Sequence, residues 1–526
     1  MRNSDLIQDK YDVVIIGAGI GGLTAAAVLA KAGLSVLTAD MNGTPGGCIA
    51  GFDRNGFHFE TAIHWLNLLG PTGPARKILD YLKENSPETP APKTVRRFKG
   101  DTFDYTLTRN PDELRDTLIR DYPADEKGIV RFFEDARRMG GAFENLTRRM
   151  QAGDTMNPIE KARLFWATTT AGLSLTRHGA KADSGLKRYF PNTPAGQIFC
   201  SESGLLPCLV PIGWLYTNNY FLSPKGGARA LPDWMCAVTR EYGGHFRFGA
   251  RALRIDLEKG RAAGVTFRDR AEGAEYHVRC RHVIAACDTE TLYTRLLPKE
   301  AVAPRVVRRI RRADLYDSAV TISLGLNRSA RDFGIGEEVV YLTKDNVPRA
   351  EQDGGDPRIA RITLLSSSSA DPSLAPPNKG SLSVYLPAKL SHFENWKTGE
   401  NFNRGAPYRE IKKRYADIIL DRIEGALIPN LRDAIELVDV ATPVTYRRYT
   451  GNRDGTIMGT RMSFRNMMSG LSGYRTPVPN LYIGGQWAEL SGGVPTAMRA
   501  GANSAMIILK QESSSAFKEA EEMFDR

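Results

Sequence analysis

Residues 11–40 constrain the fold of this chain more than any other segment. Residues 13–16 are a short, β-branched, apolar run, which predicts a buried strand. A glycine-rich turn follows, and residues 24–32 are rich in alanine and leucine, which predicts a helix. A second strand is expected over residues 34–39 and ends at Asp40. A strand, a glycine turn, a helix, a strand and an acid in this order predict a Rossmann-like βαβ unit that binds a dinucleotide.

The glycines of this turn have the spacing G-x-G-x-x-G, and each has its own task. Gly17 permits the tight turn, Gly19 lets the backbone approach a pyrophosphate, and Gly22 lets the helix pack closely on the strand. The N-terminus of the helix offers free N–H groups and a partial positive charge to phosphates. Asp40 stands near the spacing of about 20 residues at which a carboxylate binds a ribose hydroxyl. We therefore predict that these four residues contact the dinucleotide.

Length and composition limit the class of protein and its partners. A chain of 526 residues is too long for one hydrophobic core, so two or more domains are expected. Hydrophobic residues make up 42% and charged residues 25%, as in ordinary globular proteins. The net charge of +11 favours anionic surfaces. No basic stripe with interleaved aromatic residues is evident, so we expect contact with a membrane surface and no nucleic-acid partner.

The cysteines and the N-terminus indicate the compartment. The six cysteines are scattered without C-x-x-C spacing, so neither a metal site nor a disulfide framework is predicted. The first ten residues are polar and lack the apolar core of a signal peptide. No apolar run reaches the roughly 18 residues of a membrane-spanning helix. We expect a cytoplasmic protein that associates peripherally with membranes.

Two further glycine motifs carry a family resemblance. Gly46 and Gly47 precede an expected hairpin over residues 52–59, and the motif Glu-Thr-Ala-Ile-His follows at residues 60–64. Near the C-terminus, residues 480–509 read NLYIGGQWAELSGGVPTAMRAGANSAMIIL. Together with the first motif, these segments resemble the phytoene desaturase, carotenoid isomerase and retinol saturase family of FAD-dependent oxidoreductases, which is related to the amine oxidases. The resemblance covers nearly the whole chain and implies FAD as the cofactor.

The resemblance also implies an α/β architecture in two parts. The first is a Rossmann-like FAD-binding domain of the amine-oxidase type, and the second is an inserted α+β substrate domain that faces the membrane. By this resemblance the FAD domain is discontinuous and comprises residues 1–110, 223–300 and 440–512. The substrate domain comprises residues 111–222 and 301–439, and residues 513–526 form a C-terminal tail.

Further cofactor contacts follow from the family motifs. Cys48 stands where many relatives have Arg, Ala62 where they usually have Gly, and Gln486 where they often have Asp. The backbone at Ala252 is expected to meet the adenine, and the helix that begins near Val494 can stabilise negative charge on a reduced flavin. The cofactor contacts implied in this way are Gly46, Gly47, Cys48, Ala62, Ala252, Gly485, Gln486 and Val494.

The predicted reaction is flavin redox chemistry on a hydrophobic polyene or isoprenoid lipid, by desaturation, saturation or cis–trans isomerisation. His64 and Glu60 are the candidate catalytic groups by resemblance, and His64 can equally be a hydrogen-bonded structural residue. Two alternatives stay open. One is an enzyme related to amine or porphyrinogen oxidases, and the other is a lipid-binding protein of the same fold without redox chemistry.

Overall fold

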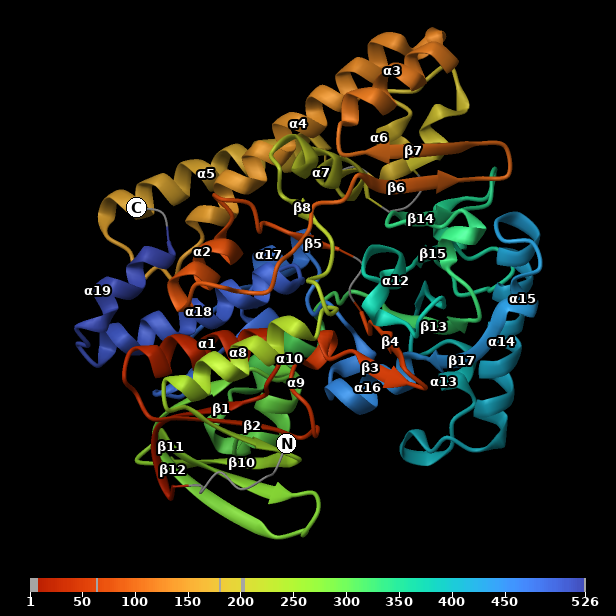
Figure 1. The fold of residues 1–526 in the computed structure, drawn as a ribbon. Coiled ribbons are helices and arrows are strands. Elements are labelled where there is room, and N and C mark those ends of the chain that lie inside the picture. Colours follow the sequence, from red (N-terminus) through yellow and green to blue (C-terminus); the bar gives the residue numbers. More distant parts are fainter. Residues whose placement is uncertain (1–7, 63–64, 179–180, 200–203, 525–526) are drawn as a thin grey trace.

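The computed structural model describes residues 8–62, 65–178, 181–199 and 204–524. Two seven-stranded sheets organise the molecule, and each has its own hydrophobic core. In Figure 1 the first sheet lies at the lower left, the second lies at the right, and long helices run along the upper edge. The expected α/β architecture, with a Rossmann-like part and a second α+β part, is confirmed.

The first sheet contains the predicted βαβ unit. Parallel strands form its centre, and an antiparallel meander continues it on one side, in the order β10-β11-β12-β1-β2-β9 with β18 paired to β12. The strands are β1 (Lys10–Ile16), β2 (Val36–Asp40), β9 (His245–Phe248), β10 (Ala250–Glu258), β11 (Arg261–Asp269), β12 (Glu275–Ala285) and β18 (Leu481–Ile483).

Three helices cover one face of this sheet, namely α1 (Ile20–Lys31), α8 (Ala230–Glu241) and α18 (Val494–Gln511). Two of them touch backbone to backbone. A Cβ atom on Gly501 of α18 would lie 2.0 Å from the carbonyl oxygen of Gly21 in α1, and one on Gly21 would lie 2.3 Å from Cα of Gly485. This close approach brings the N-terminal and C-terminal glycine motifs together.

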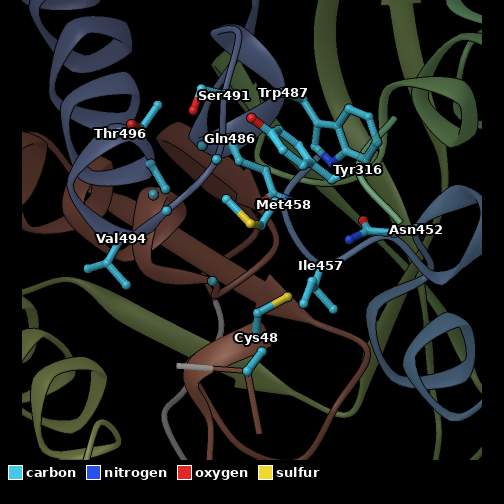
Figure 2. Close-up of a pocket in the computed structure, with 18 of the residues that line it drawn as sticks. Cys48, Tyr316, Asn452, Ile457, Met458, Gln486, Trp487, Ser491, Val494 and Thr496 are labelled. Carbon is cyan, nitrogen blue, oxygen red and sulfur yellow. The ribbon is translucent and has the colours of Figure 1, made fainter. Parts of the chain in front are cut away.

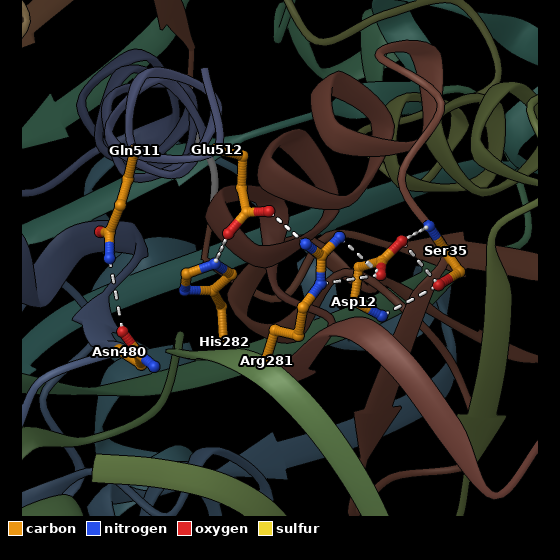
Figure 3. Close-up of polar contacts among 7 residues, drawn as sticks. All are labelled: Asp12, Ser35, Arg281, His282, Asn480, Gln511 and Glu512. Atoms are coloured by element: carbon orange, nitrogen blue, oxygen red, sulfur yellow. Dashed lines mark hydrogen bonds and ion pairs between the residues drawn. The ribbon is translucent and has the colours of Figure 1, made fainter. Parts of the chain in front are cut away.

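A network of polar side chains links strands β1 and β12 of the same sheet to the residues that follow α18 (Figure 3). Arg281 of β12 donates to Asp12 of β1 at 2.8 Å and also to Glu512, which follows α18. Asp12 accepts from the backbone N–H of Ser35 at 2.8 Å, and His282 lies 2.7 Å from Glu512. Burial lowers the pKa of His282, and the neighbouring Glu512 opposes this shift. The network therefore ties both ends of the chain to β12.

The second sheet has the order β17-β13-β16-β15-β14-β6-β7. Helix α14 (Ala406–Ala426) packs against it. Its strands are β6 (Thr94–Lys99), β7 (Asp104–Thr108), β13 (Ser318–Leu326), β14 (Val339–Leu342), β15 (Ile362–Leu365), β16 (Gly380–Ala388) and β17 (Ile435–Ala441).

One predicted boundary differs from this topology. We predicted residues 1–110 as part of the FAD domain, but β6 and β7 belong to the second sheet, where β6 pairs in parallel with β14. The physical reason is that Val95, Phe98 and Leu107 bury their side chains in the core of the inserted part.

The upper helical layer is formed by α3 (Pro111–Asp121), α4 (Glu126–Arg149), α5 (Pro158–His178) and α7 (Leu205–Tyr216). The segment of α7 contains Pro207, Pro211 and Gly213, residue types that disfavour a helix. It is a helix nevertheless, since Pro207 lies in its first turn, where no N–H partner is lost, and only Pro211 interrupts the ladder. Among the described residues, no helix is both long and apolar enough to cross a membrane.

Candidate functional site

A single cavity of about 1600 Å³ runs from the glycine motifs of the first sheet to the second sheet and the upper helices. Every residue that we predicted to contact the cofactor lines it. These residues are Gly17, Gly19, Gly22, Asp40, Gly46, Gly47, Cys48, Ala62, Ala252, Gly485, Gln486 and Val494. Of the two candidate catalytic residues, Glu60 is not part of the lining, and His64 lies outside the described residues.

The first glycine turn is packed on one side and open on the other. Gly17 has a φ of 108°, and a Cβ there would lie 2.7 Å from the carbonyl oxygen of Ala286. A Cβ on Gly22 would lie 2.0 Å from the carbonyl oxygen of Gly17, so the start of α1 presses on the turn. A Cβ on Gly19 would meet nothing within 4 Å. The open space at Gly19 fits the close backbone approach of a pyrophosphate.

Asp40 has a second role that the sequence did not reveal. One carboxylate oxygen accepts the backbone N–H of Ala18 at 2.8 Å, and the other accepts that of Asn42 at 2.8 Å. Burial raises the pKa of this carboxyl group, and the two hydrogen bonds oppose the shift. Each oxygen keeps a further lone pair for a ribose hydroxyl. Asp40 thus holds the glycine turn as well as facing the cavity.

The second motif is joined directly to the first. The N–H of Gly46 donates to the carbonyl oxygen of Ala18 at 2.8 Å, and the hydroxyl of Thr61 donates to the carbonyl oxygen of Cys48 at 2.6 Å. Burial raises the pKa of the Cys48 thiol to about 11, so the thiol is neutral at pH 7. Cys48 therefore adds a neutral side chain to the cavity wall.

Two buried tyrosines, which sequence reasoning missed, hold the end of this motif. The hydroxyl of Tyr385 donates to the carbonyl oxygen of Glu60 at 3.1 Å, and that of Tyr446 donates to the carbonyl oxygen of Thr61 at 2.6 Å. Tyr385 comes from β16, and Tyr446 comes from α16 (Pro443–Thr450). Strand β16 and helix α16 together thereby fix the backbone that leads to Ala62 in the cavity wall.

Glu60 itself makes a structural contact. Its side chain is fully buried, and one carboxylate oxygen accepts the backbone N–H of Ala228 at 2.7 Å. The other oxygen has no hydrogen-bond partner among the described residues. Burial raises the pKa of Glu60 to about 6, while the bond from Ala228 and the nearby His58 oppose the shift. The carboxyl group joins the hairpin to the segment before α8 rather than facing the cavity.

Replacing Glu60 with glutamine is expected to stabilise the protein above pH 6. The unfolded carboxyl ionises near pH 4.5 and the folded one near 6, so stability falls between these values and stays lower above them. The difference amounts to about 2 kcal/mol. Thermal unfolding from pH 4 to 8 should show the gain of Glu60→Gln over the parent only in the upper half of the range. A variant that retains FAD but loses turnover would instead support the catalytic role predicted for Glu60.

The C-terminal motif lines the cavity beside the first turn. Figure 2 shows Val494 and Thr496 at the start of α18, Gln486 and Trp487 before it, and Cys48 from the other side, all around one pocket. The N-terminus of α18 therefore points into the cavity, as does that of α1 at Gly19. Both helix ends offer partial positive charge to an anionic cofactor.

The other end of the cavity is largely apolar. Helices α4 and α7 and strands of the second sheet contribute its walls, which include Phe143, Leu146, Met150, Leu205, Leu206, Val210, Pro211, Trp214, Tyr341 and Leu386. The guanidinium group of Arg96, on β6, lies in this apolar end of the cavity. Sequence reasoning missed Arg96 because a break in the β6–β7 register between Thr94 and Arg96 removes the alternation that marks inward residues.

The donor set fits FAD. Glycines stand where side chains would collide with backbone, two helix N-termini face one cavity, and the carboxylate of Asp40 lines the same cavity at the end of β2. The apolar region next to them has room for a flat ring system and a hydrophobic second molecule.

Known proteins are similar to this chain over most of its length. The model of the family of flavin-containing amine oxidoreductases matches residues 20–404. An all-trans-retinol 13,14-reductase of Danio rerio is 26% identical over 512 residues, which cover 92% of this chain and 84% of the relative. Prolycopene isomerase 1 of an Oncidium hybrid cultivar is 24% identical over 465 residues, which cover 85% and 75% of the two chains.

A solved structure shows the same fold. Putrescine oxidase with bound putrescine superimposes with a TM-score of 0.60 at 13% sequence identity, and the match covers 95% of this chain and 99% of that one. The predicted FAD cofactor and oxidoreductase class are thereby confirmed. The chain is an FAD-dependent oxidoreductase and belongs to the family of flavin-containing amine oxidoreductases.

Proposed function

We propose that this enzyme acts on a long hydrophobic polyene of the carotenoid or retinoid type. The observation that carries the proposal is the continuity of the cavity, which joins the cofactor cradle at Gly19 to the apolar end between α4 and α7. The relatives named as a retinol reductase and a prolycopene isomerase support the same substrate class. When bound, FAD supplies hydride transfer to or from a substrate carbon.

The residues of this chain contribute orientation and a dry environment. Leu205, Val210 and Phe143 offer apolar walls that hold an extended chain and exclude water. Cys48 adds no charge, because its thiol is neutral at pH 7. The N-termini of α1 and α18 stabilise negative charge in the cofactor cradle.

An amine substrate, as in putrescine oxidase, fits this cavity less well. A protonated amine entering the apolar end would meet the guanidinium of Arg96, and two like charges in a poorly solvated site repel each other strongly. A lipid-binding protein without redox chemistry is disfavoured because the first glycine motif, with Gly17, Gly19 and Gly22, is intact and lines the cavity.

The test mixes the FAD-loaded protein with candidate polyenes under anaerobic conditions. Desaturation is expected to bleach the visible absorbance of oxidised FAD, saturation to restore it in protein reduced beforehand, and isomerisation to change the polyene without a net change in the flavin. The products are identified by chromatography. A protein that leaves polyenes unchanged and is bleached by a simple amine would contradict the proposal.

We further propose that α5 contacts the surface of an anionic membrane. Ile159, Phe165 and Trp166 on this helix are exposed by 64%, 65% and 67%. Lys161 and Arg163 are exposed beside them. Arg163 belongs to a cluster of positive charge with Arg148 and Arg149, because burial and then the charges of the other two arginines lower the pKa of Arg149. Exposed apolar and aromatic side chains next to basic ones match the interface of an anionic bilayer.

The helix also reaches the cavity, because Gly172 of α5 lines it together with Met467 of α17 (Phe464–Ser469). Met467 and Met468 are themselves exposed by 51% and 73%. A membrane contact at α5 would therefore lie next to the apolar end of the cavity, where a lipid substrate enters.

The double substitution Phe165→Ser and Trp166→Ser is expected to weaken binding to phosphatidylglycerol vesicles by about 100-fold or more, since each ring buried in the membrane contributes about 1.5–3 kcal/mol. Added salt should weaken binding of the parent as well. Co-sedimentation with the vesicles measures both effects. Val438→Ser is the control, because this exposed apolar side chain lies on β17 in the second sheet. Equal sedimentation of the parent and the double variant would contradict the proposed contact.

A further inference from the structure

The apolar end of the cavity contains a buried cation in an aromatic cage. The side chain of Arg96 is only 2% exposed to solvent and lines the cavity. Its guanidinium carbon lies 5.2 Å from the ring centre of Tyr341, 5.7 Å from that of Trp65 and 6.0 Å from that of Tyr220. The three rings stabilise the positive charge and fix the plane of the guanidinium group.

A second hydrogen-bond donor lies beside this cage. The rings of Trp214 and Trp65 are 5.4 Å apart, and both residues line the cavity. The indole N–H of Trp214 is buried and has no acceptor among the described residues. The guanidinium of Arg96 and the indole of Trp214 can donate hydrogen bonds but cannot accept them. The wall that they form therefore suits a ligand group that only accepts hydrogen bonds.

An ion pair also lies in the wall of this cavity. Asp353 and Arg361 both line the cavity, and the guanidinium of Arg361 lies 2.6 Å from the carboxylate of Asp353. A guanidinium group has five N–H donors, so contacts with the surrounding protein and with a ligand can coexist.

We propose that Arg96 and Trp214 bind a carboxylate at the end of the polyene, so that the preferred ligand is a polyene acid rather than a hydrocarbon. This inference rests on the proposed function and specifies its substrate. A planar carboxylate pairs with the fork of N–H donors of an arginine, and the low polarity around the cage strengthens the bond. A hydrocarbon end would desolvate the same donors without replacing their hydrogen bonds.

The neighbouring arginine supplies a matched control. Arg97 is adjacent on β6, but its guanidinium forms two hydrogen bonds with Asp104, at 2.8 and 2.7 Å, on the partly exposed side of the sheet. The residue is not among those that line the cavity. Arg96→Gln and Arg97→Gln thus remove one positive charge each from the same strand, and only the first removes it from the cavity.

The experiment compares all-trans-retinoic acid with its methyl ester, which has the same polyene but no charge, at about pH 8, where the acid is ionised. Dissociation constants for the FAD-loaded protein are measured by quenching of tryptophan fluorescence. The parent and Arg97→Gln should bind the acid about 10-fold more tightly than the ester, and Arg96→Gln should lose this preference while it still binds the ester. Trp214→Phe should weaken binding of the acid by a smaller factor.

Several outcomes would overturn the inference. Equal binding of acid and ester to the parent contradicts it, as does an unchanged preference in Arg96→Gln. If Arg96→Gln does not retain FAD, the inference is tested by two other results. These are the preference of the parent for the acid over the ester and the weaker binding of the acid by Trp214→Phe. Binding of both retinoids without preference leaves the proposed function intact and refutes only the role of Arg96. Binding of neither refutes the polyene proposal itself.

Discussion

Replacing Gly501 with alanine is expected to destabilise the folded protein by about 3 kcal/mol or more. The new Cβ would lie 2.0 Å from the carbonyl oxygen of Gly21, and neither atom can rotate away because both belong to helix backbones. α18 must therefore move away from α1, which also displaces Gly485 and the start of α18 from the cofactor. We expect a lower midpoint of chemical unfolding and a lower content of FAD after purification.

Gly141→Ala is the matched control for this substitution. Gly141 lies within α4, and a Cβ there would meet nothing within 4 Å. Alanine favours helix over glycine by about 1 kcal/mol, so this variant should be as stable as the parent or slightly more stable. A Gly501→Ala variant with the stability and FAD content of the parent would show that the two helices are not in tight contact.

Replacing Gly19 with alanine should have the opposite pattern, with a normal fold and poor cofactor binding. Its φ of −70° suits any residue, and a Cβ would meet no protein atom within 4 Å. The methyl group would project where the pyrophosphate approaches the backbone. We expect the dissociation constant of FAD to rise by about 10- to 100-fold, or about 1.4–2.8 kcal/mol. Titration of the apoprotein with FAD, followed by flavin fluorescence, measures it.

The stability of the apoprotein separates this effect from misfolding. The unfolding midpoint of Gly19→Ala without FAD should equal that of the parent. Gly43→Ala serves as the control, since a Cβ there also meets nothing within 4 Å but Gly43 does not line the cavity. Unaltered FAD affinity in Gly19→Ala would place the pyrophosphate elsewhere.

The cofactor half of the molecule could be predicted from the sequence because its signals are local. The order of strand, glycine turn, helix and acid is contained in residues 11–40, and the structure forms β1, α1 and β2 there. The C-terminal motif needed the family resemblance, because its contact with α1 joins residues far apart in the chain.

The substrate half could not be predicted because its contacts are distant and irregular. Strand β6 pairs with β14, which lies far along the chain, and its pair of arginines reads as a solvated surface. The register break before Arg96 directs that side chain into the cavity, and the sequence shows no alternation of polar and apolar residues that would predict this. Trp65 and Trp214 belong to different elements and come together only through tertiary packing. No property of the single residues marks them as neighbours.

The contact between α1 and α18 also sets the order of events when the chain is made. Every residue from Ile20 to Ala30 in α1 is buried, and α18, which covers part of this surface, begins at residue 494. At about 5–20 residues per second, the ribosome needs tens of seconds to reach it. During that time the nascent chain exposes an apolar helix and lacks half of its cofactor cradle. FAD can therefore be captured only near the end of translation, and any chain that stops before α18 is a target for chaperones and proteases.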